Sequence, residues 1–507
     1  MQIEWLLACK PRPVQEEAIL RSYYGFRSRE GRDDVPRPEP IRASGNPAIG
    51  WGHLMEMRLG KTPTLLNEIL LLEKYQDVKR RIIFSPNSYK HTWANEVQSF
   101  GLLQPVHAFE TSKIGKAEDF TAENYDDFIL VVNYEALIYD HVNKFLQHLL
   151  LTSSHRTIVA ADESIKIKNH ASQITRAAMT HAVEANYTRI LTGLPMTQGP
   201  QDLYSQLRFI RELNGKNFYA FRNKFCKMGG FKGKKIVGVK ADMEEELNKL
   251  ITGTAFVAKR KDWGRVTEPE HYMMNLDLND KQLKYYLEME EEFITTLDTG
   301  EEISVDQVIS QMLKLQQISS GFVYDEHGEM VKLVSDLTKT PKMKAVMDML
   351  EEEIDPASKV IIPYHYGASG DLLLEALDQY NPRVIRGKQW MHKHKRDVDE
   401  EKHIFNTHPA SRVMLLQIQA GKYGHTLVGT EKMRCTHMLF YENTYSLDDR
   451  NQIEMRNTAE TQDWTNVYLD FVSSPVEKNA IAALQRKESI VEAVLGTYNP
   501  NKEVKTI

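Results

Sequence analysis

Several features that would place this chain in a specialised class of protein are scarce or missing. No apolar run reaches about 18 residues, so the sequence offers no candidate membrane span. The start, MQIEWLLACK, has no basic lead and only a short apolar stretch, unlike a secretory signal. The three cysteines, Cys9, Cys226 and Cys435, are far apart and form no CxxC pair, which argues against a disulfide framework or a zinc ribbon. We therefore expect a cytoplasmic protein with no membrane partner.

An excess of positive charge is also missing. The formal net charge of −6 rules out a chain that coats nucleic acid with a uniformly basic surface, although it allows a local basic groove. What the chain does have is length. Its 507 residues, 41% of them hydrophobic, correspond to about three to four domain-sized units with more than one core.

The first large region alternates between strand-like and helix-like segments. A helical pattern, TPTLLNEILLLEKY, is followed by apolar β-rich runs at 80–86, 128–134, 156–163 and 189–195. Because buried strands that alternate with helices form parallel sheets, this region predicts an α/β lobe. The rhythm returns after about residue 346, with strand-like runs at 358–366, 383–387, 412–420, 436–443 and 466–474 and a closing helix near 475–495.

The region between them differs in character. Long helical patterns such as DKQLKYYLEMEEEFITTL dominate it, and its segment 216–240 carries eight Lys or Arg residues and no acid. We therefore predict three parts: an N-terminal lobe over 1–210, a mostly helical insertion over 211–345, and a C-terminal lobe over 346–507.

The sharpest local signal is MEMRLGKT at 55–62, the end of a phosphate-binding loop directly before a helix. Gly60 would let backbone N–H groups close on phosphate oxygens, Lys61 would reach the β- and γ-phosphates, and the Thr62 hydroxyl would bind Mg²⁺. Met55 stands where the first glycine of the full pattern would be. Alone, the pattern is equally compatible with a glycine turn beside a surface lysine.

A second signal is the acidic pair at the end of IVAADESIKIKN, residues 158–169. At the end of a buried strand, Asp162 can hold Mg²⁺ while Glu163 orients and deprotonates an attacking water. Two solvated acids at a strand end are the commoner case for such a pair. Their position about 100 residues after the phosphate loop favours a nucleoside triphosphatase.

Together with further blocks, these segments form an ordered series that resembles the Swi/Snf-type ATPases of helicase superfamily two. The first-lobe blocks are PRPVQ at 11–15, MEMRLGKT, SPNSYKHTWANEV at 85–97 with Trp93 and Glu96, VVNYEAL at 131–137, DESIKIKN, and LTGLPMTQGPQDLYSQLRFI at 191–210. The later blocks are KLQQISSGF at 314–322, SKVIIPYHY at 358–366, LLQIQAGKYGHTL at 415–427, YENTYSLDDRNQIEMR at 441–456 and VEKNAIAALQRKESIVEAVL at 476–495.

The resemblance implies two tandem RecA-like lobes with parallel sheets, which clamp ATP and step along DNA. It implies catalytic roles for Lys61, Asp162, Glu163 and Arg456, and a Mg²⁺ ion held by Thr62 and Asp162. It places ATP contacts on a further set of residues: Gln15, Arg58, Gly60, Lys61, Thr62, Gly424 and Gln452. The family is mostly a translocase of duplex DNA, so this activity, with ATP and Mg²⁺ as cofactors, is the expected one.

DNA would be gripped by its phosphates, without sequence specificity, on loops at strand ends. The expected contacts are Ser85, Lys90, Thr192, Gly193, Gln419 and Gly421. The basic segment 216–240 adds Lys232, Lys234 and Lys235 in a Gly-rich, hairpin-like stretch. A charge run is usually a solvated face, but eight cations without an acid indicate a polyanion partner. We expect a monomer that acts on double-stranded or branched DNA.

Two positions depart from the family pattern. Ile165 stands where relatives carry His or Gln, and Ala459 stands where the second arginine of QxxxRxxR would be. That arginine stabilises the transferring phosphoryl group, a contribution of about 10³–10⁵ in rate. Three alternatives follow: Arg450 or Arg412 replaces it, hydrolysis is slow, or the chain is a DNA-binding protein with a degenerate ATPase.

Because the chain is compact, we expect no chromatin-reading modules in it. The MRLGKT form of the phosphate loop is similar to versions carried by bacterial viruses, and the fork-remodelling branch of the family is similar as well. We therefore expect a phage branch-migration or fork-remodelling helicase, acting in replication, recombination or repair in the host cytoplasm. An ATPase subunit of a restriction or defence system shares the same core, although such subunits usually bring nuclease or methylase modules.

Overall fold

The structure is a computed structural model, and it describes residues 10–27, 39–40, 47–87, 89–100, 105–109, 125–126, 128–213, 215–229, 233, 235–263, 267–298, 305–325, 327–334, 336–421, 426–459, 462–495 and 505–506. The chain divides into two compact units. The first comprises Met1–Gly264 with Lys487–Asn499, and the second comprises Arg265–Arg486 with Pro500–Ile507.

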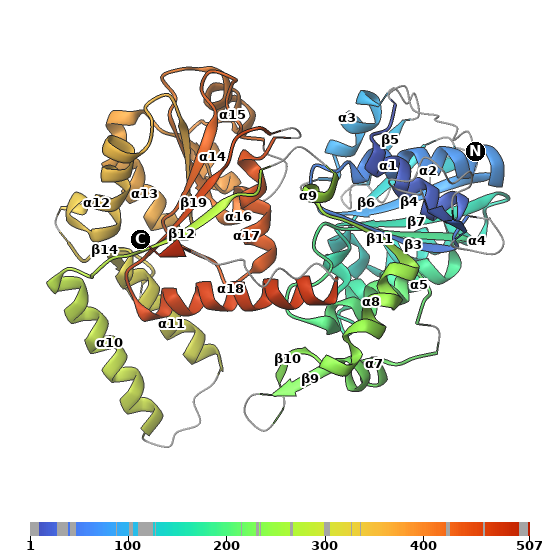
Figure 1. Cartoon of the computed structure of the whole chain (residues 1–507), viewed down its shortest axis with the longest axis horizontal. Coiled ribbons are helices and arrows are strands. Elements are labelled where there is room, and N and C mark those ends of the chain that lie inside the picture. The colour runs from blue at the N-terminus through green and yellow to red at the C-terminus, as the bar shows by residue number, and fades with distance from the viewer. Residues whose placement is uncertain are drawn as a thin grey trace. The chain divides into compact units, whose positions relative to one another are not determined.

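The first unit is built on a seven-stranded sheet of order β11-β3-β8-β7-β4-β6-β5 (Figure 1). All of its neighbouring strands are parallel. The strands are β3 (Gly50–Met55), β4 (Val78–Ser85), β5 (Val106–Ala108), β6 (Ile129–Asn133), β7 (Arg156–Asp162), β8 (Tyr187–Leu191) and β11 (Ala255–Ala258). The four strand runs predicted in this region correspond to β4, β6, β7 and β8.

Both faces of this sheet are covered, as its continuous apolar strands require. Successive residues of a strand point to opposite faces: Ile83 packs with Leu66 and Ile69 of helix α2, whereas the ring of Phe84 lies against His181 of helix α5. The helices of the unit are α1 (Pro13–Ile19), α2 (Lys61–Gln76), α3 (Thr92–Ser99), α4 (Asp140–Leu151), α5 (Gln173–Glu184), α6 (Leu203–Phe209), α7 (Phe218–Phe225), α8 (Glu244–Thr254) and α9 (Arg260–Trp263).

The second unit is built on a parallel sheet of order β16-β17-β15-β18-β19-β12-β20. Its strands are β12 (Glu270–Asn275), β15 (Lys359–Tyr364), β16 (Arg383–Ile385), β17 (Val413–Gln417), β18 (Cys435–Phe440), β19 (Val467–Val472) and β20 (Lys505–Thr506). The five strand runs predicted after residue 346 are all present.

Alternate residues again divide the core of the second unit into two layers. Ile362 packs in a cluster with Leu373 of helix α13, whereas Ile361 packs in another with Phe405 of helix α15 and Ile453 of helix α17. The helices are α10 (Asp280–Asp298), α11 (Val305–Ser319), α12 (Pro341–Asp348), α13 (Gly367–Ala376), α14 (Lys388–Lys393), α15 (Val398–Thr407), α16 (Ile418–Gly421), α17 (Leu447–Glu454) and α18 (Pro475–Val494). These two sheets confirm the predicted pair of α/β lobes with parallel strands.

The stretch 211–345 is mostly helical among its described elements, as predicted. It also contains strands that the sequence analysis did not identify as such: β11 completes the first sheet and β12 joins the second. The division between the compact units falls at Gly264, inside this stretch. The stretch further contributes two antiparallel pairs, β9 (Cys226–Gly229) with β10 (Lys235–Val239), and β13 (Phe322–Tyr324) with β14 (Met330–Lys332).

Two further observations concern the described part of the chain. No described helix combines the length and the apolar character needed to cross a bilayer. Cys226 and Cys435 are buried free thiols.

Candidate nucleotide-binding site

Four of the predicted blocks meet at one edge of the first sheet. Strands β3, β8, β7 and β4 are consecutive neighbours and run parallel, so their carboxyl ends lie side by side. The phosphate loop follows β3, Thr192 and Gly193 follow β8, and Asp162 and Ser85 end β7 and β4. Ligands of open parallel sheets bind at this edge. The topology therefore brings together residues that are separated by more than 100 positions in sequence.

The phosphate loop depends on one glycine with a left-handed backbone. Gly60 has φ 84° and caps the N-terminus of α2. A Cβ there would strain the left-handed backbone, and it would lie 2.0 Å from Gln15 Nε2 and 2.7 Å from Arg12 Nη2, so both of these side chains would have to shift. The Lys61 ammonium donates to the Met55 carbonyl at 3.1 Å, across the loop. Helix α2 thus presents its N-terminal N–H groups and Lys61 where phosphates bind well.

Gln15 lies directly against this loop. Its side-chain amide donates to the Leu59 carbonyl at 3.4 Å, and the Arg12 guanidinium donates to the Arg58 carbonyl at 2.9 Å. The Gln15 carbonyl oxygen accepts from the Arg12 backbone N–H at 2.8 Å. Segment 11–15 therefore packs against the phosphate loop and stabilises it, although the two are about 45 residues apart in sequence. Adenine recognition by Gln15 stays a prediction.

The carboxylate of Asp162 is buried beside this loop and held by donors from other blocks. Trp93 Nε1 donates to Asp162 Oδ2 at 3.2 Å, and the Ser85 hydroxyl donates to the same oxygen at 3.4 Å. Burial, followed by the nearby charge of Glu163, raises the pKa of Asp162 to about 7, although Lys61 acts in the opposite direction. A cation placed here would relieve this unfavourable negative charge.

Glu163 occupies a strained position at the end of β7. Its φ of 49° is unusual for a residue with a side chain, a kind of strain that clusters at functional sites. The Thr192 hydroxyl donates to Glu163 Oε2 at 3.4 Å. A Cβ on Gly193 would lie 3.3 Å from the Met57 backbone nitrogen, so the segment after β8 passes close to both the acidic pair and the phosphate loop.

A buried bridge links the acidic pair to helix α6. The Ser164 hydroxyl donates to Gln206 Oε1 at 2.7 Å, and the Gln206 amide donates to the Pro195 carbonyl at 2.6 Å. Ile165, where the resemblance leads one to expect a polar residue, is buried. The polar link between the DESIKIKN block and the block at 191–210 therefore runs through Ser164 and Gln206, a contact that the local sequence patterns did not predict.

Glu96 is a further member of the site to which the sequence analysis assigned no role. It accepts a hydrogen bond from the Tyr89 hydroxyl at 3.3 Å, and the Thr62 side chain also bonds to it. Burial raises its pKa, against the pull of Lys61 and Arg58. Trp93 and Glu96 are three residues apart on α3, which places both on the face turned toward the loop. That helical spacing was the available signal.

The donor set of this edge fits Mg²⁺. Thr62 and Asp162 supply a hydroxyl and a carboxylate, the hard oxygen ligands that Mg²⁺ takes together with water and substrate phosphates. Among the residues that the structure describes, no group of three or more His, Cys, Asp or Glu could hold a metal by itself. The site therefore suits an ion that arrives with a nucleotide rather than one caged by protein.

The predicted nucleotide residues of the second unit lie on α17 and the turn after it. Gln452 is buried, its side-chain amide donates to Asp448 at 2.8 Å, and its side-chain oxygen Oε1 has no partner among the described residues. Arg456 is also buried, and its Nε donates to the backbone carbonyl of Gln452 at 2.7 Å. The roles of both residues toward ATP stay predictions, and Gly424 lies outside the described residues.

The two arginines considered as substitutes for the one missing at position 459 have structural partners. Arg450 is buried, pairs with Asp470 and Glu454, and lies over the ring of Phe440. Arg412 donates to the carbonyls of Leu350 and Ile354, each at 2.7 Å. Within their own unit, these contacts account for both side chains.

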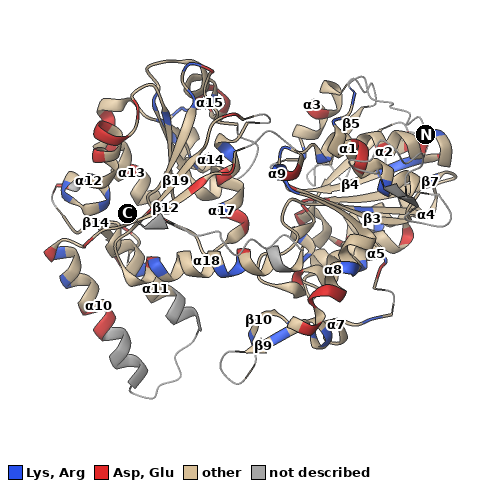
Figure 2. Ribbon diagram, viewed as in Figure 1, with Lys and Arg blue, Asp and Glu red and all other residues tan. Residues whose placement is uncertain are grey.

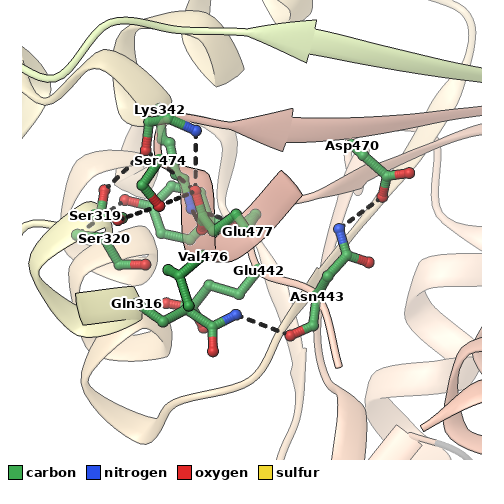
Figure 3. Close-up of polar contacts among 12 residues, drawn as sticks. Gln316, Ser319, Ser320, Lys342, Glu442, Asn443, Asp470, Ser474, Val476 and Glu477 are labelled. Atoms are coloured by element: carbon green, nitrogen blue, oxygen red, sulfur yellow. Dashed lines mark hydrogen bonds and ion pairs between the residues drawn. The ribbon is translucent and has the colours of Figure 1, made fainter. Parts of the chain in front are cut away.

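Figure 3 shows how the same unit fixes the segment that leads into α17. Asn443 donates to Asp470 at 2.9 Å, and its own carbonyl accepts from the Gln316 amide at 3.0 Å. Close by, the buried ammonium of Lys342 pairs with Glu477 and donates to the Tyr441 carbonyl at 3.0 Å. The ends of β18 and β19 are thus tied to α11, α12 and α18.

The predicted DNA contacts fall into several environments. Ser85 and Lys90 are buried: the Ser85 hydroxyl faces Asp162 and the Lys90 ammonium donates to the Phe109 carbonyl at 3.1 Å, and their contacts with DNA stay predictions. Thr192 is likewise buried beside Glu163. Gln419 is exposed after β17, whereas Gly421 is buried against Leu416. Lys235 is exposed, and Lys232 and Lys234 lie outside the described residues.

Comparison with known proteins adds to this geometry. A protein p41 of Acyrthosiphon pisum secondary endosymbiont phage 1 is 23% identical over 351 residues, which cover 65% of this chain and 72% of p41. An uncharacterised ATP-dependent helicase of Mycoplasma pneumoniae is 21% identical over 87% of this chain, and the human DNA repair and recombination protein RAD54B is 25% identical over 31% of it. The matches span 40% and 17% of the lengths of those two proteins.

Among solved structures, the Sulfolobus solfataricus SWI2/SNF2 ATPase core in complex with dsDNA is similar, with a TM-score of 0.41 and 18% identity over 98% of this chain and 96% of that one. The model of the SNF2-related domain matches residues 52–321, more than half of the chain. This match begins in β3, before the phosphate loop, and includes both the acidic pair and the segment after β8. The chain therefore belongs to the SNF2-related family of ATP-hydrolysing enzymes within helicase superfamily two.

Proposed function

We propose that this protein is an ATP-driven motor that translocates on double-stranded or branched DNA, contacting the phosphate backbone without sequence preference. The SNF2-related family is one of ATP-dependent DNA remodelling enzymes. The finer proposal concerns the substrate and the outcome: duplex or junction DNA, moved by branch migration or fork remodelling during phage replication, recombination or repair.

One observation carries the proposal. The phosphate loop, the Asp162–Glu163 pair and the Thr192–Gly193 segment share one sheet edge, with Lys61, Thr62 and Glu96 around a buried carboxylate of raised pKa. Such a cluster of like charges is unfavourable by itself and becomes favourable with a cation and a polyphosphate. The site is thus suited to a nucleoside triphosphate with Mg²⁺.

In the proposed mechanism, the backbone N–H groups at the start of α2 and the Lys61 ammonium bind the phosphates of ATP. Lys61 now donates to the Met55 carbonyl, and it would exchange this bond for phosphate oxygens. Thr62 and Asp162 would hold Mg²⁺, which neutralises charge on the β- and γ-phosphates. Gln15, packed against the loop, would contact the base.

Glu163 would position the attacking water and accept its proton. Its carboxylate is oriented by the Thr192 hydroxyl at 3.4 Å, so the segment after β8 senses the group that acts on the γ-phosphate. Through Ser164 and Gln206 the same strand end is tied to α6. We propose that this connection carries the state of the nucleotide to the DNA-contacting loops. Arg456 would stabilise charge on the transferring group.

The relatives support the choice of DNA and of a phage setting. The aligned proteins include one called an ATP-dependent helicase, one called a DNA repair and recombination protein, and one encoded by a phage. A phage-encoded enzyme of this kind would act as a monomer on DNA in the cytoplasm of its host.

ATP hydrolysis measured without DNA and with single-stranded, duplex or four-way junction DNA tests the proposal. Glu163→Gln, which keeps size and hydrogen bonding but removes the base, is the matched variant. We expect duplex or junction DNA to stimulate the wild type strongly, and this stimulation to be lost in the variant, because general-base catalysis contributes about 10²–10⁴.

The opposite result has a specific meaning. Duplex binding without stimulated hydrolysis would exclude a motor and favour the alternative of a DNA-binding protein with a degenerate ATPase, which Ile165 and Ala459 suggest. Stimulation by DNA together with movement of a junction would instead require that the missing second arginine is either replaced or dispensable.

A further inference from the structure

The antiparallel ribbon β9–β10 lies outside both large sheets. It follows α7 and extends beyond the sheet of the first unit (Figure 1). Its register pairs Cys226 with Val239, Lys227 with Gly238, Met228 with Ile236 and Lys235 with Gly229, and Val237 forms a bulge. A bulge strengthens the twist of a ribbon and re-aims its side chains.

The register gives the ribbon two different faces, because residues directly opposite in an antiparallel pair share a face. One face carries Cys226, Met228, Ile236 and Val239, and its base is buried in the unit. The other face, which we call the lysine face, carries Lys227, Gly229, Lys235 and Gly238. A Cβ built on Gly238 meets nothing within 4 Å, so the space above Gly238 is open, whereas a Cβ on Gly229 would lie 3.0 Å from the Val237 side chain.

Each lysine of the lysine face stands opposite a glycine, so the residue directly across the ladder offers it no charged partner. Blue segments that mark Lys or Arg lie on the β9–β10 ribbon (Figure 2). Lys227 and Lys235 are exposed, and among the described residues neither ammonium has a hydrogen-bond or ion-pair partner. Lys224, one turn earlier on α7, pairs with Glu246 of α8. Glu246 thus pairs with α7, and Glu245 pairs with Lys249 of its own helix.

We propose that the lysine face of the β9–β10 ribbon binds the phosphates of duplex DNA, as a contact separate from the strand-end loops of the motor. This inference rests on the proposed function, which supplies the duplex. Gly238, opposite Lys227, would let a phosphate backbone approach the ribbon closely, and a two-stranded ribbon is narrow enough to follow the major groove. Segment 216–240, which contains no acid, provides no repulsion against this partner.

Edge lysines have a competing structural use, because they prevent an exposed ribbon from pairing with another chain. Charge reversal separates the two roles. Glutamate at both positions still blocks edge pairing but repels phosphate, so solubility would be kept while DNA affinity falls.

The experiment measures binding of a fluorescein-labelled 30-base-pair duplex by anisotropy, without nucleotide, from 50 to 300 mM KCl. The variants are Lys227→Ala/Lys235→Ala and Lys227→Glu/Lys235→Glu. The control is Lys144→Glu/Lys249→Glu, an equal charge change at exposed positions of α4 and α8 in the same unit. Each phosphate contact adds about 0.9 to the salt slope. The alanine variant should therefore lose about 1.8 from the slope and bind about 10- to 100-fold more weakly at 100 mM salt.

A salt slope and an affinity equal to those of the wild type in both ribbon variants would overturn the inference and leave edge protection as the role of the lysines. An equal loss in the control variant would overturn it as well, because the effect would then be one of net charge. ATP hydrolysis at saturating duplex keeps the two proposals apart. Stimulated hydrolysis with unchanged ribbon-variant binding contradicts only the ribbon contact, whereas ribbon-dependent binding without stimulation contradicts only the motor.

Discussion

Charged residues near the carboxyl edges of the two sheets stand in opposite environments. At the edge of the first sheet, burial raises the pKa values of Asp162 and Glu96, the nearby charges of Glu163 and Glu96 add to the effect on Asp162, and Lys61 is the nearby cation. At the edge of the second sheet, buried charges are matched: Lys342 pairs with Glu477, and Arg450 pairs with Asp470 and Glu454.

This difference separates a site from a scaffold. Like charges held together at the cost of stability persist where a ligand relieves them. Matched buried charges require no ligand, and they fix the positions of the elements that carry them. Substitutions at the first edge should therefore affect turnover more than folding, and substitutions at the second edge should affect folding first.

The largest expected effect is on the stability of the second unit. Glu477→Ala would leave the fully buried Lys342 ammonium without its counter-charge, which costs about 3–5 kcal/mol in the free energy of unfolding. Urea unfolding monitored by circular dichroism measures this change. Lys478→Ala, an exposed neighbour on the same helix, should change stability by less than about 0.5 kcal/mol.

A paired replacement tests the explanation itself. Lys342→Met combined with Glu477→Leu removes both charges and keeps apolar volume, so it should recover most of the lost stability. If the double variant is as unstable as Glu477→Ala, the loss reflects packing rather than an unpaired charge, and the contrast between the two edges fails.

The next effect is on turnover at the first edge. Lys61→Ala removes the cation expected to bind the β- and γ-phosphates, and DNA-stimulated ATP hydrolysis should fall by about 10²- to 10³-fold. Its unfolding free energy should change little, because Lys61 is only half-buried and makes one hydrogen bond to a carbonyl. Lys74→Ala, at the exposed end of the same helix, is the control. If Lys61→Ala instead loses much of its unfolding free energy, Lys61 has a structural role, and the first edge does not differ from the second in the way proposed.

Much of this contrast could be predicted from sequence, for a physical reason. Buried parallel strands appear as continuous apolar runs, so β4, β6, β7, β8 and β15 to β19 were identified. The apolar run of β7 placed Asp162 and Glu163 at a strand end, and the helical pattern that follows Lys61 placed this lysine at a helix start. These are local patterns, because each depends on residues that are close together along the chain.

What could not be predicted depends on contacts between distant segments. Ser164 and Gln206 are 42 residues apart, and nothing in either local pattern shows that they are bonded. Strand β12, EHYMMN, is only half-buried, so it has no apolar run to reveal it. The burial of Ser85 was missed because a strand-end serine gives no sign of whether its hydroxyl faces a carboxylate or solvent.

Acid sensitivity offers a comparison of the two units that does not involve the edges. Burial lowers the pKa of His181 in the first unit and of His437 in the second to about 4. Since an unfolded histidine binds its proton near pH 6.5, the stability that each neutral imidazole contributes is present above that pH and is lost as pH falls toward 4.

Between pH 7.5 and pH 5, each histidine should account for about 2 kcal/mol of lost stability. His181→Gln should reduce the pH dependence of the first unit, and His437→Gln that of the second, when urea unfolding is repeated at both pH values. Equal pH dependence in wild type and variants would show that other groups govern acid sensitivity.

The smallest effect concerns the bridge between the acidic pair and α6. Ser164→Ala removes the hydroxyl that donates to Gln206 Oε1 and leaves that buried oxygen without its donor, which costs about 1–2 kcal/mol of stability. Because Gln206 still donates to Pro195 and Asp202, α6 should stay in place. ATP hydrolysis without DNA should be nearly unchanged. Its stimulation by duplex DNA should fall about two- to fivefold, because a 1 kcal/mol change in coupling corresponds to about fivefold. Ser205→Ala, which removes a longer bond of 3.3 Å to the Lys168 carbonyl, is the matched control. If both variants lose the same share of DNA stimulation, α6 contributes by packing alone. The Ser164–Gln206 bond would then be a structural contact, like the paired charges of the second sheet, and would not couple Glu163 to DNA.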